Sequence, residues 1–209
     1  ISERHHIVIM QVHTLEVLTR LYIALKDYGQ AEFYLSQAFG LAEEEPFTSF
    51  WLLTDKSTLL TEKKEYDAAI IWAKKSIDSV IEYSDGYDIA LSYLTLGNAY
   101  LQSGKFRQAE WSLNIAYESC LKCGYLHYSI VKKQLELYTL MDEADRIRSK
   151  KQELSEICRK YKYEWVMDIS AEGSDSDFME PSDHEDLKIS ILGSFHIVLN
   201  GKDINIKRN

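Results

Sequence analysis

Apolar residues recur at helical spacing through most of the chain. Over residues 7–163 they return every three to four positions, which places them along one face of an α-helix. Pro46 and Pro181 are the only prolines, so long stretches are free to continue as helices. Near the end the period changes to two, because Leu187 and Ile189 alternate with polar residues as in a β-strand. The pattern predicts a long helical body followed by short strands.

The helical part contains a repeated unit, which is clearest over residues 90–120. Its first predicted helix carries aromatic, large and small residues on one face, namely Tyr93, Leu96, Gly97 and Tyr100. After a Ser-Gly-Lys break, the second helix carries on one face Ala109, Leu113 and Ala116. Small residues at Gly97 and Ala109 let two antiparallel helices approach closely. Each unit is therefore expected to be a tightly packed helix pair.

This unit resembles the tetratricopeptide repeat, whose pattern is aromatic, Leu-Gly, aromatic, then Ala, a large apolar residue and Ala. Further copies are marked by alanines 35 to 40 residues apart, at Ala31, Ala69, Ala109 and Ala144. These intervals exceed the family's unit of about 34 residues and are similar to the lengthened repeats of MalT-like bacterial transcription activators. The resemblance implies an all-α fold, a right-handed superhelix of about four antiparallel helix pairs. An ordinary helical bundle is the alternative.

The strand-forming tail has a resemblance of its own. Residues 191–204 read Ile-Leu-Gly-Ser-Phe-His-Ile-Val-Leu-Asn-Gly-Lys-Asp-Ile, and Asn200-Gly201 is a strong signal for a type I′ hairpin turn. This string is similar to the opening of an OmpR-type winged-helix domain, above all to the version in SARP-type transcriptional activators. The resemblance implies a short C-terminal β-hairpin fragment that begins a DNA-binding domain, with the recognition helix beyond Asn209. A β-hairpin of another kind of domain is the alternative.

Charge divides the chain into three parts. The formal net charge is −9, and eight acids with no Lys or Arg fall between Asp168 and Asp186. Repelling charges and few apolar residues are typical of an extended linker. We therefore predict a helical repeat domain over 1–167, an acidic flexible linker over 168–186 and the truncated start of a winged-helix-like domain over 187–209. The acidic chain itself is not expected to bind DNA, which would be contacted only through the domain that the tail begins.

Candidate chemistry is sparse. Cys120 and Cys123 have CxxC spacing with His127 nearby, but a zinc site needs a fourth ligand and usually a second close pair. The sequence contains no phosphate-binding loop, nucleophile elbow or zinc-protease motif. We therefore predict no enzymatic activity, no catalytic residues, no metal and no cofactor. The odd cysteine count favours a reducing compartment, the cytoplasm, and no stretch approaches the roughly 18 uncharged apolar residues of a membrane span.

The repeat register projects a set of first-helix residues onto the concave side of the expected superhelix. The candidate groove residues are Glu16, Arg20, Trp51, Thr58, Asn98, Gln102 and Lys133. Others on the same face are His13, Thr54, Glu62, Leu94, Ser129 and Glu136. Mixed polar and apolar groups suit a groove for a peptide or protein segment. The resemblance adds a specific role for Asn98, since tetratricopeptide grooves often use an inward asparagine to hold a ligand backbone or carboxylate.

The order of helical repeats, acidic linker and winged-helix-like opening predicts a sensor or interaction segment of a bacterial transcription regulator. Binding of a protein, peptide or effector, or self-association, would be relayed to the DNA-binding domain. Two other functions stay open. One is a scaffold module that assembles proteins without a transcriptional role, and the other is a region whose repeats form a homodimer with the groove unused. Neither the main prediction nor these alternatives involves a membrane.

Overall fold

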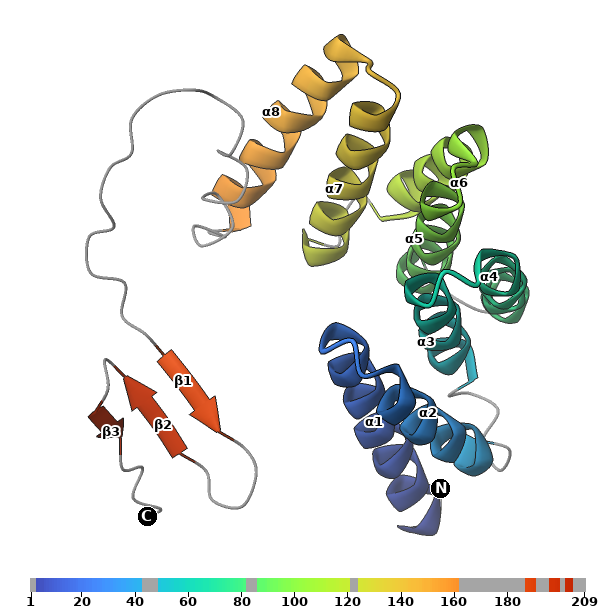
Figure 1. The fold of residues 1–209 in the computed structure, drawn as a ribbon, viewed down its shortest axis with the longest axis vertical. Coiled ribbons are helices and arrows are strands. Elements are labelled where there is room, and N and C mark those ends of the chain that lie inside the picture. Colours follow the sequence, from blue (N-terminus) through green and yellow to red (C-terminus); the bar gives the residue numbers. More distant parts are fainter. Residues whose placement is uncertain are drawn as a thin grey trace. The chain divides into compact units, whose positions relative to one another are not determined.

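The computed structural model describes residues 3–42, 49–81, 86–120, 124–161, 187–190, 196–199 and 202–204. The chain divides into two compact units, Ile1–Ser170 and Ala171–Asn209. Within the described ranges the first unit contains eight α-helices (Figure 1), which are α1 (Glu3–Ala24), α2 (Tyr28–Ala42), α3 (Ser49–Glu62), α4 (Tyr66–Val80), α5 (Gly86–Gln102), α6 (Phe106–Ser119), α7 (Gly124–Leu140) and α8 (Ala144–Tyr161). The predicted all-α repeat region is confirmed for these residues.

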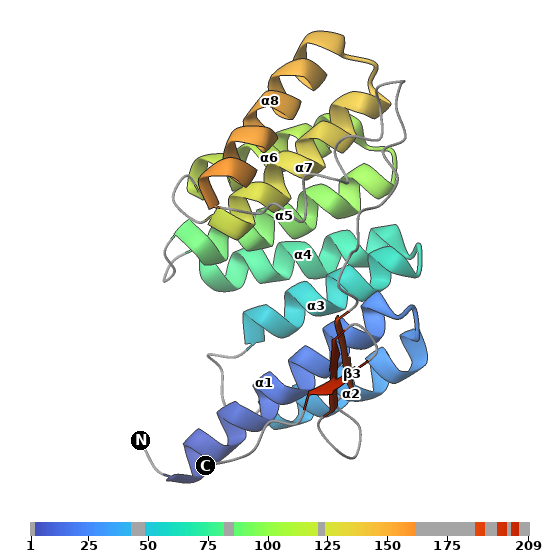
Figure 2. The same cartoon turned by 90° about the vertical axis from the view of Figure 1, so that its left-hand side faces the viewer.

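Consecutive helices of the first unit run antiparallel and form four pairs, from α1 with α2 to α7 with α8 (Figure 2). Each pair is joined by a turn with one residue at positive φ, namely Lys26, Lys64, Gly104 and Asp142. In the third turn, the Gly104 N–H donates to the Leu101 carbonyl at 3.0 Å and the Lys105 N–H donates to the Tyr100 carbonyl at 2.9 Å. The other three turns make the same two hydrogen bonds, which define a Schellman motif. The four pairs are therefore structurally equivalent at their turns.

The turns fix which residues of the second helices are equivalent. The second helices begin at Tyr28, Tyr66, Phe106 and Ala144. Ala31, Ala69 and Ala109 each lie three residues further on and are fully buried, as predicted. In the fourth pair this position is Ile147, which packs against the core, while Ala144 is exposed. The prediction of Ala144 as the fourth anchoring alanine is therefore wrong by three residues, because α8 only begins there.

A close contact between small and large residues joins the two helices of the third pair. A Cβ added at Gly97 of α5 would lie 2.8 Å from Cγ and Cδ2 of Leu113 in α6, so no larger residue fits without movement. Seven residues before each turn residue, the same position holds Thr19 in α1 and Ser57 in α3, both fully buried. The Ser57 hydroxyl donates to the Ala69 carbonyl of α4 at 2.9 Å. A small hydroxyl residue thus replaces glycine where its O–H finds a backbone acceptor.

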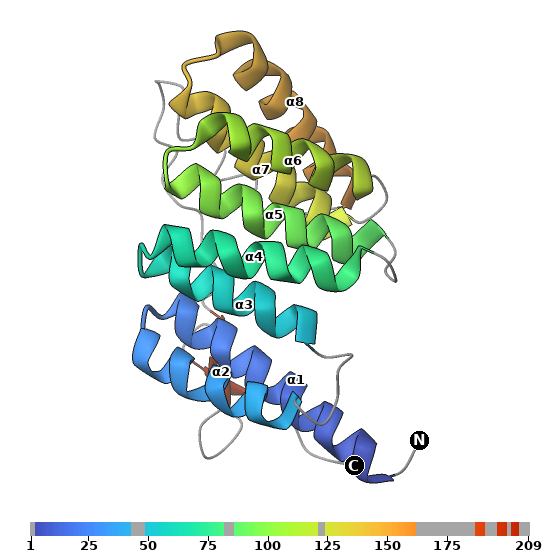
Figure 3. The ribbon, with the colours of Figure 1, turned by 90° about the vertical axis from the view of Figure 1, so that its right-hand side faces the viewer.

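The pairs stack in chain order, and their first helices lie next to one another (Figure 3). Helix α1 contacts α3, α3 contacts α5, and α5 contacts α7, while each second helix contacts the first helix of the next pair. Apolar side chains fill the spaces between neighbouring pairs, as where Leu52 and Leu59 of α3 join the core formed with Ala31 and Leu35 of α2. The first helices therefore form one continuous layer along the stack.

Helix α1 differs from the other first helices in its exposed apolar surface. Over Ile7–Ala24 it is long and apolar enough to cross a membrane on length and composition alone. The sequence analysis considered uncharged stretches, whereas this one contains Glu16 and Arg20. In the fold, α1 packs on α2 and α3 and buries Val12 and Ile23 in the core shared with them. It also carries Arg20, which is ion-paired to α3.

The second unit contains three short strands within its described residues, β1 (Leu187–Ser190), β2 (His196–Leu199) and β3 (Lys202–Ile204). They pair antiparallel in the order β1-β2-β3, with Ile189 opposite Ile197 and Ile197 opposite Ile204. The expected type I′ turn at Asn200-Gly201 and the linker over 168–186 lie outside the described residues. The β-hairpin with that turn, the winged-helix assignment and the domain boundaries stay predictions.

Candidate partner-binding face

The predicted groove residues lie on the layer of first helices, where the structure brings them into two polar clusters. The first cluster joins α1 to α3 and contains Glu16, Arg20 and Trp51. The second joins α5 to α7 and contains Gln102 and Lys133. Thr58 of α3 and Asn98 of α5 belong to neither cluster.

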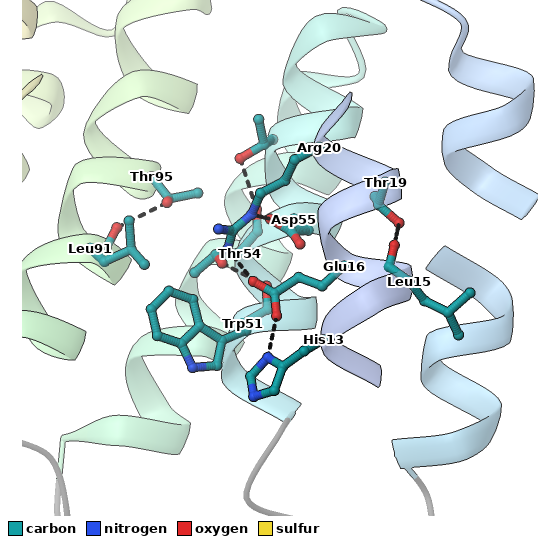
Figure 4. A network of polar contacts seen from close by, with 11 residues as sticks. His13, Leu15, Glu16, Thr19, Arg20, Trp51, Thr54, Asp55, Leu91 and Thr95 are labelled. Atoms are coloured by element: carbon teal, nitrogen blue, oxygen red, sulfur yellow. Dashed lines mark hydrogen bonds and ion pairs between the residues drawn. The ribbon is translucent and has the colours of Figure 1, made fainter. Parts of the chain in front are cut away.

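The first cluster is centred on Arg20, whose guanidinium is shared by two carboxylates (Figure 4). Its Nη2 lies 2.6 Å from Oε1 of Glu16 on the same helix, and its Nε donates to Oδ1 of Asp55 on α3 at 2.8 Å. His13 lies one turn earlier, with Nδ1 3.2 Å from Oε2 of Glu16. One positive charge therefore stands between two acids at the junction of the first two helix pairs.

Asp55 is the most confined member of this cluster. Its side chain is 5% exposed, and its Oδ2 has no hydrogen-bond partner among the described residues. Burial raises the pKa of Asp55 to about 7, since the charged form loses hydration; Arg20 opposes this effect and Glu16 adds to it. Burial lowers the pKa of Arg20, but the nearby Asp55 and Glu16 have a larger opposite effect. The pKa of Arg20 is therefore raised overall, and the guanidinium stays charged. Asp55 therefore keeps its proton up to near-neutral pH.

An aromatic surface borders the first cluster. The guanidinium of Arg20 lies 5.4 Å from the centre of the Trp51 ring, within cation–π range. The Trp51 ring in turn contacts Tyr87, at the start of α5, with their centres 5.9 Å apart. Arg20 is 45% exposed in its side chain, so the cation and this ring together present a surface to solvent. Glu16, by contrast, is buried, and its carboxylate forms ion pairs with Arg20 and His13.

The second cluster links α5 to α7 in a similar way. The Gln102 amide donates to Oε1 of Glu136 at 2.9 Å, and Nζ of Lys133 donates to Oε2 of the same carboxylate at 2.8 Å. Gln102 is exposed and the other two are half-buried. Three residues that were expected on the same face, Gln102, Lys133 and Glu136, are therefore brought together.

The remaining predicted residues behave differently from one another. The Thr58 hydroxyl donates to the Thr54 carbonyl at 2.9 Å and the Thr54 hydroxyl donates to the Trp51 carbonyl at 2.7 Å, so both bond within α3. Asn98 is half-buried, and its Oδ1 has no hydrogen-bond partner among the described residues. Because that oxygen is itself shielded from solvent, a ligand N–H could reach it only if neighbouring side chains moved. Of the predicted set, Asn98 is thus the residue with unused hydrogen-bonding capacity.

Sequence analysis missed Asp55, although the repeat contains a signal for it. Nine residues before each turn residue the chain has Val17, Asp55, Thr95 and Lys133, one from each first helix. An acid at that position of α3 faces the preceding first helix, where Arg20 lies. The turn register was needed to align these positions, and the Leu-Gly motif, absent from α3, could not supply it.

A third polar cluster lies on the last two pairs. The Tyr117 hydroxyl donates to Oε1 of Glu153 at 2.7 Å, His127 Nε2 lies 3.2 Å from the same oxygen, and Lys150 donates to Oε2 at 2.8 Å. The hydrogen bond to Glu153, together with partial burial, raises the pKa of Tyr117 to about 12. The polar atoms named here all have protein partners, so we interpret this cluster as a structural contact that joins α6, α7 and α8.

The described residues offer little for catalysis or metal binding. Cys120 is buried, and Cys123 lies outside the described residues. Over the described ranges, no group of three or more His, Cys, Asp or Glu could hold a metal ion.

Comparison with known families gives a match to part of the chain. A tetratricopeptide-repeat model matches residues 17–45, which cover the end of α1 and all of α2. No curated protein matches the chain. The match and the eight helices fit a tetratricopeptide-repeat region, a class of module that generally binds protein partners and carries no catalytic residues. The chain therefore has the features of a protein–protein interaction module.

Proposed function

We propose that the helical unit is the partner-binding region of a bacterial transcription regulator and that it binds a protein or peptide segment along its first helices. The observation that carries this proposal is the row of accessible polar and aromatic groups on that layer. It runs from Arg20 and Trp51 to Gln102 and Lys133. Continuous rows of this kind suit an extended ligand, which contacts successive repeats in turn.

The stacking supports a curved arrangement with this layer on the inside. First helices touch one another directly from α1 to α7, whereas the described second helices make no comparable contacts among themselves. Elements that are closer together lie on the inner side of a curve. We therefore infer a right-handed superhelix whose concave face is the first-helix layer, as is usual for stacked helix pairs.

The chemistry of the face favours a partner segment with exposed amides and at least one charged group. The exposed Gln102 amide can hydrogen-bond a peptide backbone, and the exposed cation of Arg20 stands beside an aromatic ring. Arg20 binds a carboxylate of the partner only by giving up part of its bonding to Glu16 or Asp55. Protonation of Asp55 would ease that exchange, since it removes one of the competing charges.

Relay to DNA is the second part of the proposal. The tail after residue 187 would begin a winged-helix domain, joined to the helical unit by the acidic segment, and partner binding would alter that domain's access to DNA. The cytoplasmic location follows from this role. The rival function, favoured by the family match alone, is a scaffold module without a transcriptional role.

Photo-cross-linking in cells tests the binding face. A photoreactive amino acid replaces Gln102 on the first-helix layer or, as a matched control, Trp111 on the exposed side of α6. We expect a discrete cross-linked partner from position 102 and none from position 111, and Trp51→Ala should reduce that product. Equal labelling from both positions, or labelling only from position 111, would contradict a groove on the first helices.

Chromatin immunoprecipitation of the natural protein that contains this chain tests the regulatory role. Enrichment at defined promoters supports a transcription regulator, and uniform background supports the scaffold function instead. A gel-shift assay at moderate salt adds a check on the chain itself. Residues 1–209, with a net charge of −9, should not retard DNA, and tight binding would contradict the proposed dependence on a further domain.

A further inference from the structure

Two N–H groups on one edge of the Arg20 guanidinium are divided between two acids. Nε donates to Oδ1 of Asp55 on α3 at 2.8 Å, and Nη2 lies 2.6 Å from Oε1 of Glu16 on α1. These two nitrogens lie side by side on the guanidinium, and their spacing matches the two oxygens of a single carboxylate. Arg20 can therefore bind Asp55 with both nitrogens, or with one nitrogen while the other holds Glu16.

The oxygen of Asp55 that would accept the second N–H has no other donor. Among the described residues Oδ2 has no hydrogen-bond partner, and the Asp55 side chain is 5% exposed, which leaves little room for hydration. The hydroxyls of Thr54 and Thr58 on the same helix donate to carbonyls of α3 and do not supply a donor. An unpaired buried oxygen costs much more free energy in a charged carboxylate than in a neutral acid.

The charges that act on Asp55 come from the neighbouring helix α1. Among the described residues, Arg20 and Glu16 are the charged groups that act on it directly, Arg20 favouring its charged form and Glu16 opposing that form. His13 of α1 contacts Glu16, and Tyr87 of α5 acts on Arg20, so both influence Asp55 through these two residues. Burial has the largest effect and raises the pKa of Asp55 to about 7. Asp55 therefore changes its charge close to neutral pH.

We propose that the proton on Asp55 sets which acid holds Arg20, and that partner binding at the first cluster depends on pH for this reason. With the proton in place, Asp55 accepts from Nε alone and Nη2 stays on Glu16, as in the structure. When the proton leaves, Nη2 turns from Glu16 to Oδ2, and both N–H groups of the edge close on Asp55. The charged oxygen drives this exchange, because a bidentate pair satisfies both oxygens of the carboxylate at once.

The two arrangements differ in the charge that a partner meets. With neutral Asp55, the cation of Arg20 and the anion of Glu16 cancel, whereas ionised Asp55 leaves the cluster with an excess negative charge. A carboxylate of the partner is then repelled, and it has to compete with a bidentate pair for the guanidinium. A partner segment that places a carboxylate on Arg20 should therefore bind more tightly when Asp55 is neutral. This inference rests on the proposed binding face, since it concerns the regulation of that face.

NMR on the whole 209-residue chain tests the exchange at Arg20. The ¹³C signal of the Asp55 carboxyl group and the ¹⁵N signal of Arg20 Nε are followed from acid to alkaline pH. We expect both signals to change with one common midpoint near neutral pH, and Asp55→Asn should remove the change at Arg20. Glu16→Gln removes the competing acid, so it should lower the midpoint of Asp55 by about one pH unit. A midpoint that Glu16→Gln leaves in place, or an Arg20 signal that does not follow Asp55, would overturn the proposal.

Glu32→Gln is the matched control for the loss of an acid. Glu32 of α2 pairs with Lys63 at 2.7 Å, and its side chain is 43% exposed, so the same substitution there removes a carboxylate that does not contact Arg20. It should leave both NMR signals and their midpoint unchanged. Far-ultraviolet circular dichroism confirms that the three variants fold.

Cross-linking from position 102, in permeabilised cells held at about pH 6 or about pH 8, tests the effect on the partner. We expect the yield of the cross-linked partner to fall by up to about tenfold between these values, and to be equal at both in Asp55→Asn. With natural Asp55, equal yields or a higher yield at alkaline pH would overturn the pH dependence and leave the binding face in place. The absence of a product at either pH would overturn the binding face itself, and this inference with it.

Discussion

Replacing Gly97 by alanine tests how closely α5 and α6 approach each other. The added Cβ would lie 2.8 Å from two carbon atoms of Leu113, well inside the usual contact distance of about 3.5–4.0 Å. Overpacking of this kind costs about 1–3 kcal/mol, and alanine returns up to about 1 kcal/mol through its better helix propensity. We therefore expect Gly97→Ala to lower the free energy of unfolding by about 1 kcal/mol, as measured by urea denaturation.

Two controls separate the contact from the helix propensity. Gly40 lies in α2 with no atom within 4 Å of an added Cβ, so Gly40→Ala should stabilise the protein by up to about 1 kcal/mol. In a Leu113→Ala background the obstructing carbons are gone, and Gly97→Ala should then become stabilising as well. If Gly97→Ala stabilises the natural protein as much as Gly40→Ala does, the close contact does not exist.

Three further changes have expected outcomes. The pKa of Asp55 is raised on folding from 3.8 to about 7, so its contribution to the free energy of unfolding is complete below pH 3.8 and is lost as pH rises. The free energy of unfolding should therefore fall by up to about 1.4 kcal/mol per pH unit between these two values. Asp55→Asn should flatten that slope, as measured by urea denaturation at a series of pH values. Lys64→Gly removes a side chain at φ 64° and should raise the free energy of unfolding by about 1 kcal/mol, whereas Gly104→Ala at φ 73° should lower it. Ser57→Ala removes the hydrogen bond to the Ala69 carbonyl and should cost about 1 kcal/mol in the same denaturation assay, with Ser36→Ala, on exposed α2 surface, as a nearly neutral control. A pH slope that Asp55→Asn leaves unchanged, or turn variants with the opposite signs, would contradict these assignments.

The third helix pair was the most predictable part of the fold. Its Leu-Gly pair and its Ala109 are the residues at which the two helices touch, so sequence and packing carry the same information there. The fourth pair was harder, because α8 has Ile147 where the others have alanine. An alanine three residues earlier imitated the motif, and only the backbone turn at Asp142 fixes the true register.

The contacts of the candidate face could not be predicted from the sequence. Helical periodicity places Arg20 and Trp51 on first helices, and the structure brings them within 5.4 Å of each other. The carboxylate that holds Arg20 comes from Asp55, and that contact depends on how one pair stacks on the next. Periodicity within a helix contains no information about this stacking offset. The exposed apolar residues of α1, such as Met10, Val17 and Leu21, were missed for the same reason, since exposure depends on what lies beside the helix.

Residue-resolved amide hydrogen exchange, followed by NMR, tests most directly whether the chain is built from four equivalent helix pairs. In each second helix, the amide three residues after the start donates to the residue just before the helix: Ala31, Ala69, Ala109 and Ile147 bond to Asp27, Glu65, Lys105 and Glu143 at 2.9–3.0 Å. We predict slow exchange at all four of these amides and fast exchange at Ala144, whose N–H lies at the start of α8. Fast exchange at Ile147 with protection at Ala144, or protection in only some of the four pairs, would contradict the repeated architecture.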